Sequence, residues 1–283
     1  MSAGLKACAP SSRREGGVAP GYDVRVFVAI TRAVSPALAS CELTHLQRTT
    51  IDVERARQQH RAYEQALIAA GGMVQRLESG ADMPDAVFIE DTAIVFDELA
   101  LIARPGAVSR RHETAAVTDA LAPYRPIVQI EAPGTVDGGD VLVVGREVFV
   151  GLSTRTNNAA VEQMRGALEP HGYAVHPVIV RGCLHLKSAV TALDAGTLLV
   201  NPNWIDTERF DRFACIEVDP EEPSAANALR LPDRIVFPAA FPRTAERLVA
   251  RGFRLAVVDA SELAKAEGAV TCCSLILSAV AAQ

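Results

Sequence analysis

Two adjacent cysteines, Cys272 and Cys273, lie in the apolar run GAVTCCSLIL near the end of the sequence. A cysteine acts as a nucleophile in its thiolate form; an adjacent imidazolium lowers the pKa of the thiol, and a carboxylate orients the imidazole ring. His185 in CLHLKSAV can supply the imidazole, and the acidic stretches PDAVFIED (84–91) and GTVDGGDVLVV (134–144) can supply the carboxylates. Together these residue types indicate nucleophilic catalysis by a thiolate.

The cysteines also have an ordinary structural interpretation. If Cys272 and Cys273 share a β-strand, their side chains point to opposite faces, so one thiol enters a pocket and the other packs outside it. The spacing does not decide which. The six cysteines follow no framework spacing, and we expect reduced thiols rather than disulfides. Free cysteine commonly behaves as a small buried hydrophobic residue, a role that we assign to Cys8, Cys41, Cys183 and Cys215.

The histidine and the acids are open to two interpretations as well. A lone histidine among apolar residues is more often a core residue than a catalyst, and His185 is favoured only by its place in the repeat described below. PDAVFIED can be a solvated loop, and Asp137 and Asp140 can accept backbone hydrogen bonds in a Gly-rich turn that lacks the spacing of a phosphate loop. The histidines that we assign to the surface or to packing are His45, His60, His112, His171 and His176.

A repeated unit positions these side chains. Pairs of apolar runs joined by short turns rich in Gly, Asp and Pro are typical of β-hairpins. Four such pairs start at Ala93, Val141, Val190 and Leu229, which are 48, 49 and 39 residues apart. Before the first pair, or after a later one, lie stretches with apolar residues at helical spacing, each ending at a glycine before a short strand. These helical residues are Tyr63, Ala66, Leu67 and Ala70; Val161, Met164 and Leu168; and Ala245, Leu248 and Val249, with the glycines Gly72, Gly172 and Gly252.

A fifth copy would be divided between the two ends of the sequence. The run VRVFVAI (24–30) would pair with the run 272–277 and close a ring, which removes exposed sheet edges. The sequence therefore predicts an α/β fold, a five-bladed pseudo-symmetric propeller of ββαβ units. We expect residues 1–20 to form a flexible tail and 21–283 to form a single catalytic domain.

The reactive residues recur at matching places in these copies, at or just before the first strand. Equivalent positions in a pseudo-symmetric ring lie at similar distances from its axis, so these side chains should converge on one central pocket. They are Glu90 and Asp91, Asp137 and Asp140, His185, Asn227 and Cys272.

Composition excludes several classes of function. The net charge of −6, the absence of a long basic run and an aromatic content of 5% argue against nucleic-acid binding. No apolar stretch reaches the roughly 18 residues that a membrane span needs, and the first twenty residues lack a signal sequence, so we expect a cytoplasmic protein. Without a CxxC pair or an HExxH helix, we expect neither a metal site nor a cofactor.

Several long motifs resemble one known family. PDAVFIED, RPGAVSRRHE, GTVDGGDVLVVGREVFVGLSTRTN, LHLKS, AANALRL and GAVTCCS occur in this order from about residue 25 onward. They resemble dimethylarginine dimethylaminohydrolase, a member of the guanidino-group-modifying enzymes with the pentein fold, a five-bladed α/β propeller. The fold that the resemblance implies agrees with the five-unit interpretation of the hairpins.

The resemblance implies a role for each motif residue. Cys272 would be the nucleophile, Cys273 its packed neighbour, His185 the general acid and base, and Asp137 the residue that orients the imidazole. Asp91, with Glu90 beside it, would bind the guanidinium. The amino-acid end of the substrate would be held by Asp85, Arg110 and Arg155, and the ligand would be covered by Leu43 in the lid-like loop ELTHLQRT. Ala266 belongs to the substrate-binding set but replaces a larger aliphatic residue, and Glu267 replaces a frequent Asp.

The implied reaction is hydrolysis of a small-molecule substrate, an Nω-methylated arginine, to citrulline and methylamine or dimethylamine, by a monomer or homodimer. The alternatives are another pentein hydrolase, such as an arginine deiminase or an enzyme acting on citrulline or agmatine, and a non-catalytic arginine-binding module. A thiol redox or metal-buffering protein is disfavoured, because adjacent strand residues point their thiols apart.

Overall fold

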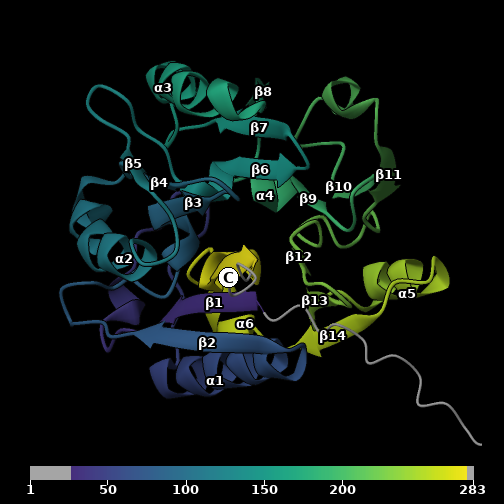
Figure 1. The fold of residues 1–283 in the computed structure, drawn as a ribbon. Helices are drawn as coiled ribbons and strands as arrows, with labels where there is room; N and C mark the ends of the chain where they lie inside the picture. Colours follow the sequence, from purple (N-terminus) through teal and green to yellow (C-terminus); the bar gives the residue numbers. More distant parts are fainter. Residues whose placement is uncertain (1–26, 279–283) are drawn as a thin grey trace, which may run out of the picture.

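Five small β-sheets surround a central axis in the computed structural model of the protein, which describes residues 27–278 (Figure 1). Each sheet has three strands, of which the first two pair antiparallel and the third pairs parallel to the second. The sheets are β15 (Leu275–Ser278), β1 (Phe27–Arg32) and β2 (Gly72–Leu77); β3 (Ala93–Val95), β4 (Ala100–Ile102) and β5 (Ile127–Gln129); β6 (Val141–Val144), β7 (Glu147–Leu152) and β8 (Ala174–Ile179); β9 (Val190–Ala192), β10 (Thr197–Val200) and β11 (Ala214–Glu217); and β12 (Leu229–Arg230), β13 (Ile235–Pro238) and β14 (Leu255–Val258).

Helices connect the second and third strands on the outside of the ring, as Figure 1 shows for α2, α3 and α5. The helices are α1 (Val53–Ala69), α2 (Thr114–Leu121), α3 (Asn158–Leu168), α4 (Leu186–Ala189), α5 (Pro242–Ala250) and α6 (Ser261–Ala264). Short 3₁₀ helices are η1 (Leu38–Ser40), η2 (Ile89–Thr92), η3 (Val108–Glu113), η4 (Gly138–Asp140), η5 (Glu169–His171), η6 (Thr207–Phe210) and η7 (Thr271–Cys273). The predicted five-bladed α/β propeller is therefore confirmed.

One blade departs from the ββαβ pattern. Between β10 and β11, residues 201–213 form only the 3₁₀ helix η6. Phe210 is fully buried there and lies against the ring of Phe149, with the ring centroids 4.6 Å apart. Together with Ile205, it joins the apolar core between the third and fourth blades.

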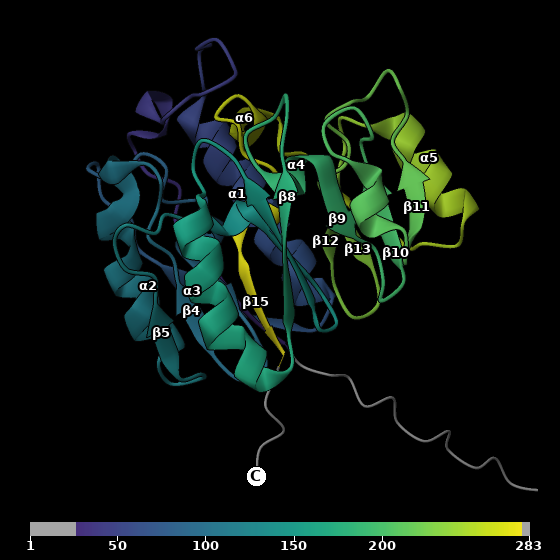
Figure 2. The ribbon, with the colours of Figure 1, turned by 90° about the horizontal axis from the view of Figure 1, so that it is seen from above.

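The ring closes through strands from opposite ends of the sequence. β1 pairs antiparallel with β15, with Phe27 opposite Ser278 and Ile30 opposite Leu275. The predicted pairing is confirmed for the described residues; 24–26 and the predicted tail 1–20 lie outside them, and the single-domain assignment stays a prediction. In Figure 2, β15 runs through the middle of the molecule.

Apolar side chains fill the space between every two neighbouring blades. Successive residues of each middle strand face different neighbours: Phe27 and Ala29 of β1 join the core on one side, while Val28 and Ile30 join the core on the other. A strand buried on both faces needs a continuous apolar run rather than an alternating one. This explains why the hairpins stand out in the sequence as unbroken apolar stretches.

Left-handed glycines end the three helical segments that the sequence predicts. The φ angles are 87° at Gly71, 80° at Gly172 and 88° at Gly252, which favours glycine at these positions. In the first segment the left-handed residue is Gly71, not Gly72. Gly72 is needed for a different reason, because a Cβ there would lie 2.6 Å from the ring of Phe27. Among the described residues, no helix is long and apolar enough to cross a membrane.

Candidate active site

The polar residues singled out by the repeat lie in short helical turns at the inner ends of the blades. η2 carries Glu90 and Asp91, Asp137 precedes η4, and His185 precedes α4. In Figure 2, α4 and α6 lie toward the same end of the ring as the loop that precedes α1. Side chains from these turns line one cavity, which is formed by Glu42, Asp85, Phe88, Asp91, Arg110, Asp137, Arg155, Leu184, His185, Ala266, Glu267, Gly268 and Cys272.

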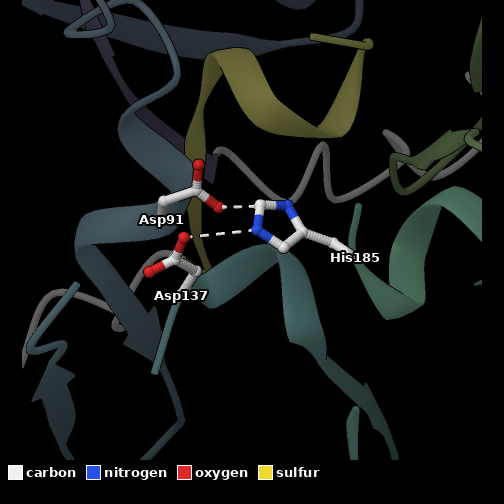
Figure 3. Close-up of side chains that lie close together, drawn as sticks. All are labelled: Asp91, Asp137 and His185. Carbon is white, nitrogen blue, oxygen red and sulfur yellow. Dashed lines mark hydrogen bonds and ion pairs between the residues drawn. The ribbon is translucent and has the colours of Figure 1, made fainter. Parts of the chain in front are cut away.

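A buried imidazole lies between two carboxylates in this cavity (Figure 3). The His185 Nε2 atom is 3.2 Å from Oδ2 of Asp137, and its Nδ1 atom is 3.8 Å from Oδ1 of Asp91. Burial opposes a positive charge on the ring, but the charges of Asp91 and Asp140 and the hydrogen bond to Asp137 outweigh it and raise the pKa of His185 to about 9. At neutral pH the ring is therefore protonated and can act as an acid.

Neighbouring groups fix both carboxylates. Asp137 is completely buried, and its Oδ1 atom accepts a hydrogen bond of 2.8 Å from the Gly106 N–H. Asp91 accepts hydrogen bonds from the Gly139 N–H at 3.0 Å and from Nη1 of Arg110 at 2.6 Å. Burial alone would raise the pKa of Asp91, but the charges of His185 and Arg110 lower it below its ordinary value. The carboxylate therefore stays ionised beside the imidazolium.

Two glycines of the GTVDGGD motif allow this close packing. A Cβ at Gly138 would lie 2.0 Å from the carbonyl oxygen of Glu90, and one at Gly139 would lie 2.5 Å from Nδ1 of His185. Neither position tolerates a side chain, since real contacts at such distances do not occur. The motif is thus a close-approach segment as well as a turn. Asp140 has the ordinary role considered above, because it accepts a hydrogen bond of 2.9 Å from the Leu186 N–H.

Cys272 lines the cavity and Cys273 does not. The expectation that Cys272 opens the last strand is wrong: residues Thr271–Cys273 form η7, and β15 begins only at Leu275. The two thiols still separate, because Cys273 is 1% exposed and packs in the apolar core between the first and last blades. Burial and the charges of Glu90 and Asp91 raise the pKa of the Cys272 thiol well above its ordinary value. In the empty cavity this thiol is protonated.

Three other predicted substrate residues line the cavity, and they differ in how far their hydrogen-bonding groups are already used. The Arg110 guanidinium bonds to protein groups: besides Asp91, it donates to the Glu113 carboxylate at 2.9 Å and to the Phe88 carbonyl at 2.9 Å. Arg155 reaches the lid through a 2.9 Å hydrogen bond from Nη2 to Oγ1 of Thr44. Burial raises the pKa of Asp85 to about 6, against the charge of Arg110. Of the two arginines, Arg155 is the one with donors left for a ligand.

Glu90 faces away from this cavity. It lines a second cavity of about 280 Å³ on the axis of the ring, where residues of the first strands of all five blades also lie. Its carboxylate accepts hydrogen bonds from Nζ of Lys187 at 2.7 Å and from Oγ1 of Thr271 at 2.8 Å. The sequence led us to expect Glu90 beside Asp91 at the guanidinium. In the structure Glu90 instead lies on the other side, in the second cavity.

The loop that contains Leu43 reaches the cavity through Glu42, which lines it. Leu43 itself does not line the cavity and is half-buried against the core between the first and last blades. The carboxylate of Glu267 accepts hydrogen bonds from three successive backbone N–H groups, those of Thr44 at 2.9 Å, His45 at 2.5 Å and Leu46 at 2.5 Å. Beneath this closed loop the free space is about 20 Å³, room for about one water molecule. An amino-acid ligand needs more space than this, so the residues that line the cavity must rearrange to admit one.

Asp91, Asp137 and His185 form the one cluster among the described residues whose ligand atoms could hold a metal ion, all within 4.8 Å of one another. A histidine binds a metal ion only as the neutral imidazole, through a nitrogen with a free lone pair. The raised pKa of His185 and the ion pair between Asp91 and Arg110 oppose this state. The cluster is better suited to proton transfer than to metal binding.

The sequence matches a known family over most of its length. Residues 29–236 match the family model described as Arginine deiminase. The chain is 44% identical over 251 residues to N(G),N(G)-dimethylarginine dimethylaminohydrolase of Streptomyces coelicolor, covering 88% of this chain and 96% of the relative. It is 38% identical over 226 residues to the protein of the same name from Pseudomonas aeruginosa, covering 79% and 89%. The chain belongs to the dimethylarginine dimethylaminohydrolase family.

Solved structures of this family have the same fold. The Pseudomonas aeruginosa protein, as a cysteine-to-serine mutant complexed with citrulline, matches with a TM-score of 0.85 at 35% identity, over 88% of this chain and 98% of that one. The N-terminal domain of ArgZ, an arginine dihydrolase from cyanobacteria, matches with a TM-score of 0.79 at 19% identity, over 88% and 97%. At that lower identity the likeness concerns the fold alone.

Sequence reasoning missed part of the cavity wall in this family member. Glu42, Phe88, Leu184 and Gly268 line the cavity but were not predicted, and Glu267 was noted only as a departure from the family pattern. Glu267 has a left-handed φ of 59°, which is uncommon outside glycine. Its position beside the glycine of the EGAVTCC segment was the available signal. Phe88 is recognisable only from the folded structure, where a Cβ added at Gly268 would lie 2.0 Å from the Phe88 ring.

The raised pKa of His185 predicts a pH-dependent stability. The pKa is about 9 in the folded protein and about 6.5 in an unfolded chain, so the stabilisation is fully present below about pH 6.5 and is lost as the pH rises through 9. We expect the free energy of unfolding, measured with urea, to fall across this window by up to about 3 kcal/mol. His185→Gln should remove the slope. An equal slope in this variant would contradict the assignment; Asp85 titrates below the window, with a pKa of about 6.

The lid contacts predict a loop whose closure depends on one carboxylate. Glu267→Ala removes the acceptor of three amide donors, each worth about 1.5–3 kcal/mol when the partner is charged. Hydrogen exchange at residues 44–46 should accelerate at least about tenfold, as measured by mass spectrometry of the corresponding peptide. Glu246→Ala, on the exposed side of α5, serves as the control. Unchanged exchange in the Glu267 variant would show that other contacts hold the loop.

Proposed function

We propose that the protein hydrolyses Nω-methylated arginine to citrulline and methylamine or dimethylamine through a covalent intermediate on Cys272. The observation that carries this proposal is that Cys272, His185, Asp137 and Asp91 line one closed cavity. It is supported by 44% identity to a relative named dimethylarginine dimethylaminohydrolase and by the likeness to a family structure complexed with citrulline.

Substrate binding is the first step. The cationic guanidinium would lie against Asp91, whose carboxylate is held ionised by Arg110 and Gly139. Arg155 would turn from Thr44 to the substrate carboxylate, since a guanidinium binds a carboxylate through paired hydrogen bonds. Asp85 would accept from the substrate amino group, and Ala266 and the lid residue Leu43 would surround the chain of the ligand.

The substrate also prepares the nucleophile. The Cys272 thiol is protonated in the empty cavity, because Glu90 and Asp91 are negative and the site is buried. A bound guanidinium adds a positive charge beside the sulfur and offsets part of this effect, so the thiol proton can leave to solvent. The nucleophile would therefore become reactive only with a ligand in place.

The reaction then needs two proton transfers at His185. The Cys272 thiolate attacks the guanidinium carbon and forms a C–S bond; the protonated imidazole gives its proton to the methylated nitrogen, the C–N bond breaks and the amine departs. A cationic thiouronium and a neutral imidazole remain. The imidazole next takes a proton from water, and the hydroxide adds to the same carbon. The hydroxyl proton of this adduct passes to the sulfur as the C–S bond breaks, so neutral citrulline leaves and both the Cys272 thiol and the protonated imidazole are restored. Asp137 would orient the ring throughout, and the general acid–base catalysis by His185 is worth about 10²–10⁴ in rate.

Loss of either reacting group should abolish turnover. We expect Cys272→Ser and His185→Ala to release no measurable citrulline from dimethylarginine, while Cys273→Ala keeps most of the activity because its thiol packs in the core. Citrulline is measured by a colorimetric assay, with thermal unfolding as the folding control. An inactive but folded Cys273→Ala protein would mean that Cys273, not Cys272, is the nucleophile.

The match to the family model described as Arginine deiminase supports a second candidate, hydrolysis of free arginine. We expect kcat/KM for mono- or dimethylarginine to exceed that for arginine by at least tenfold, because a pocket that accommodates methyl groups gains from their burial. Citrulline formation from the three substrates at equal concentration distinguishes the candidates. Preferred turnover of arginine would replace the proposal, and ligand protection without citrulline would indicate a binding module.

The free thiols support a reducing compartment. All five described cysteines are unpaired, as expected for a cytoplasmic enzyme. We propose the cytoplasm as its location, and small methylated arginines as its ligands.

A further inference from the structure

The turn that carries Cys272 is held from two opposite sides. On one side Cys273 is packed into the core between the first and last blades. On the other side Thr271, which is 4% exposed, faces the axial cavity of about 280 Å³. On that side the turn borders open space rather than packed side chains, so its position depends on directed hydrogen bonds.

Asn227 supplies two of these hydrogen bonds. Its Oδ1 atom accepts from the Thr271 N–H at 3.0 Å, and its Nδ2 atom donates to Oγ1 of Thr271 at 2.9 Å. One buried amide thus holds both the backbone and the side chain of the residue before the nucleophile. Asn227 is fixed in turn by Thr191, whose hydroxyl donates to the Ala226 carbonyl at 2.6 Å and accepts from the Ala228 N–H at 3.2 Å.

The same network reaches the helix that follows the imidazole. Nδ2 of Asn227 also donates to the Lys187 carbonyl at 3.1 Å. A second route runs from Oγ1 of Thr271 to Glu90 at 2.8 Å and from Glu90 to Nζ of Lys187 at 2.7 Å. Lys187 lies two residues after His185, in α4. Two paths of hydrogen bonds, one through Asn227 and one through Glu90, therefore join Thr271 in the turn of the thiol to Lys187 in the helix that follows the imidazole.

We propose that Asn227, Thr271, Glu90 and Lys187 form a positioning clamp that sets the Cys272 sulfur relative to His185 and to the bound guanidinium. The clamp residues touch neither the substrate nor the reacting atoms; they act through the turn and the helix. A displacement of about 1 Å at a reacting atom can cost about 10² in rate, which is why two paths to one turn matter. The inference rests on Cys272 as the nucleophile of the proposed reaction.

A purely structural role makes a different prediction. If these polar groups only satisfy one another, their loss lowers stability and leaves the reactivity of Cys272 in the folded fraction unchanged. The clamp instead predicts lost reactivity in a protein that is still folded. Asn201 offers a matched control, because it is equally buried and bonds to the Pro223 carbonyl at 2.8 Å without reaching η7.

Alkylation of Cys272 tests the clamp without any need for turnover. The probe is an α-chloroamidine, whose cationic amidine resembles the guanidinium and so requires Asp91, His185 and the sulfur in register; neutral iodoacetamide reports simple thiol reactivity. We expect Asn227→Ala and Thr271→Val to slow the chloroamidine reaction at least tenfold and the iodoacetamide reaction by less than about threefold. Thr271→Ser, which keeps the hydroxyl, should restore most of the rate, and Asn201→Ala should change neither.

The rates are followed by intact-protein mass spectrometry, with the modified residue located by peptide mapping and folding checked by thermal unfolding. Where citrulline is formed, kcat should fall in the clamp variants while KM stays within about twofold. Equal chloroamidine rates in folded wild type, Asn227→Ala and Thr271→Val would overturn the clamp, as would a wild-type protein in which the chloroamidine does not select Cys272. Loss of citrulline formation in wild type with intact selectivity would instead overturn the proposed function alone. If Asn227→Ala does not fold, the comparison of Thr271→Val with Thr271→Ser decides.

Discussion

The interaction on which the site depends is the ion pairing of a buried imidazolium with buried carboxylates. Charges removed from water are costly unless they are paired and hydrogen-bonded. Around His185 the carboxylates of Asp91 and Asp137 are each held by a backbone N–H, and Arg110 neutralises Asp91 from the other side. The arrangement raises the pKa of the imidazole and, through the charge of Asp91 and burial, the pKa of the Cys272 thiol as well. In the proposed mechanism a bound cation offsets the second effect, so activation of the nucleophile would depend on the ligand.

The propeller supplies the geometry that this pairing requires. Each blade contributes a short turn at its inner end, so groups from residues 91, 137, 185 and 272 meet although they are far apart in sequence. Gly138 and Gly139 make this approach possible, because they have no side chain and the neighbouring turns lie too close to admit one. The inner turns combine two kinds of contact: apolar residues such as Ile89, Leu186 and Cys273 pack between the blades, while polar contacts hold the side that borders the second cavity on the axis.

Much of the fold could be predicted because its signals are local. A middle strand buried on both faces is a continuous apolar run, and a left-handed glycine marks the end of a helix, so hairpins and helix ends are visible in the sequence. The repeat then indicated which polar residues would meet. What remained hidden depends on contacts between distant segments. The direction of the Glu90 side chain is set by Lys187 and Thr271, and no local pattern in the sequence shows that η6 takes the place of a helix between β10 and β11. The sequence placed the start of the last strand at Cys272, whereas β15 begins at Leu275, because the 3₁₀ helix η7 has no apolar periodicity that separates it from the strand.

Closure of the ring by β15 has a consequence for biosynthesis. This strand and the turn with Cys272 leave the ribosome after the other described strands, and β15 can pair only with β1, which is among the first to appear. A contact of such long sequence separation forms late, because the entropy of closing the loop must be paid before the contact is gained. Until then the partly made chain lacks Cys272, the thiol that we propose as the nucleophile. The segment that closes the ring therefore also brings the proposed nucleophile into the site.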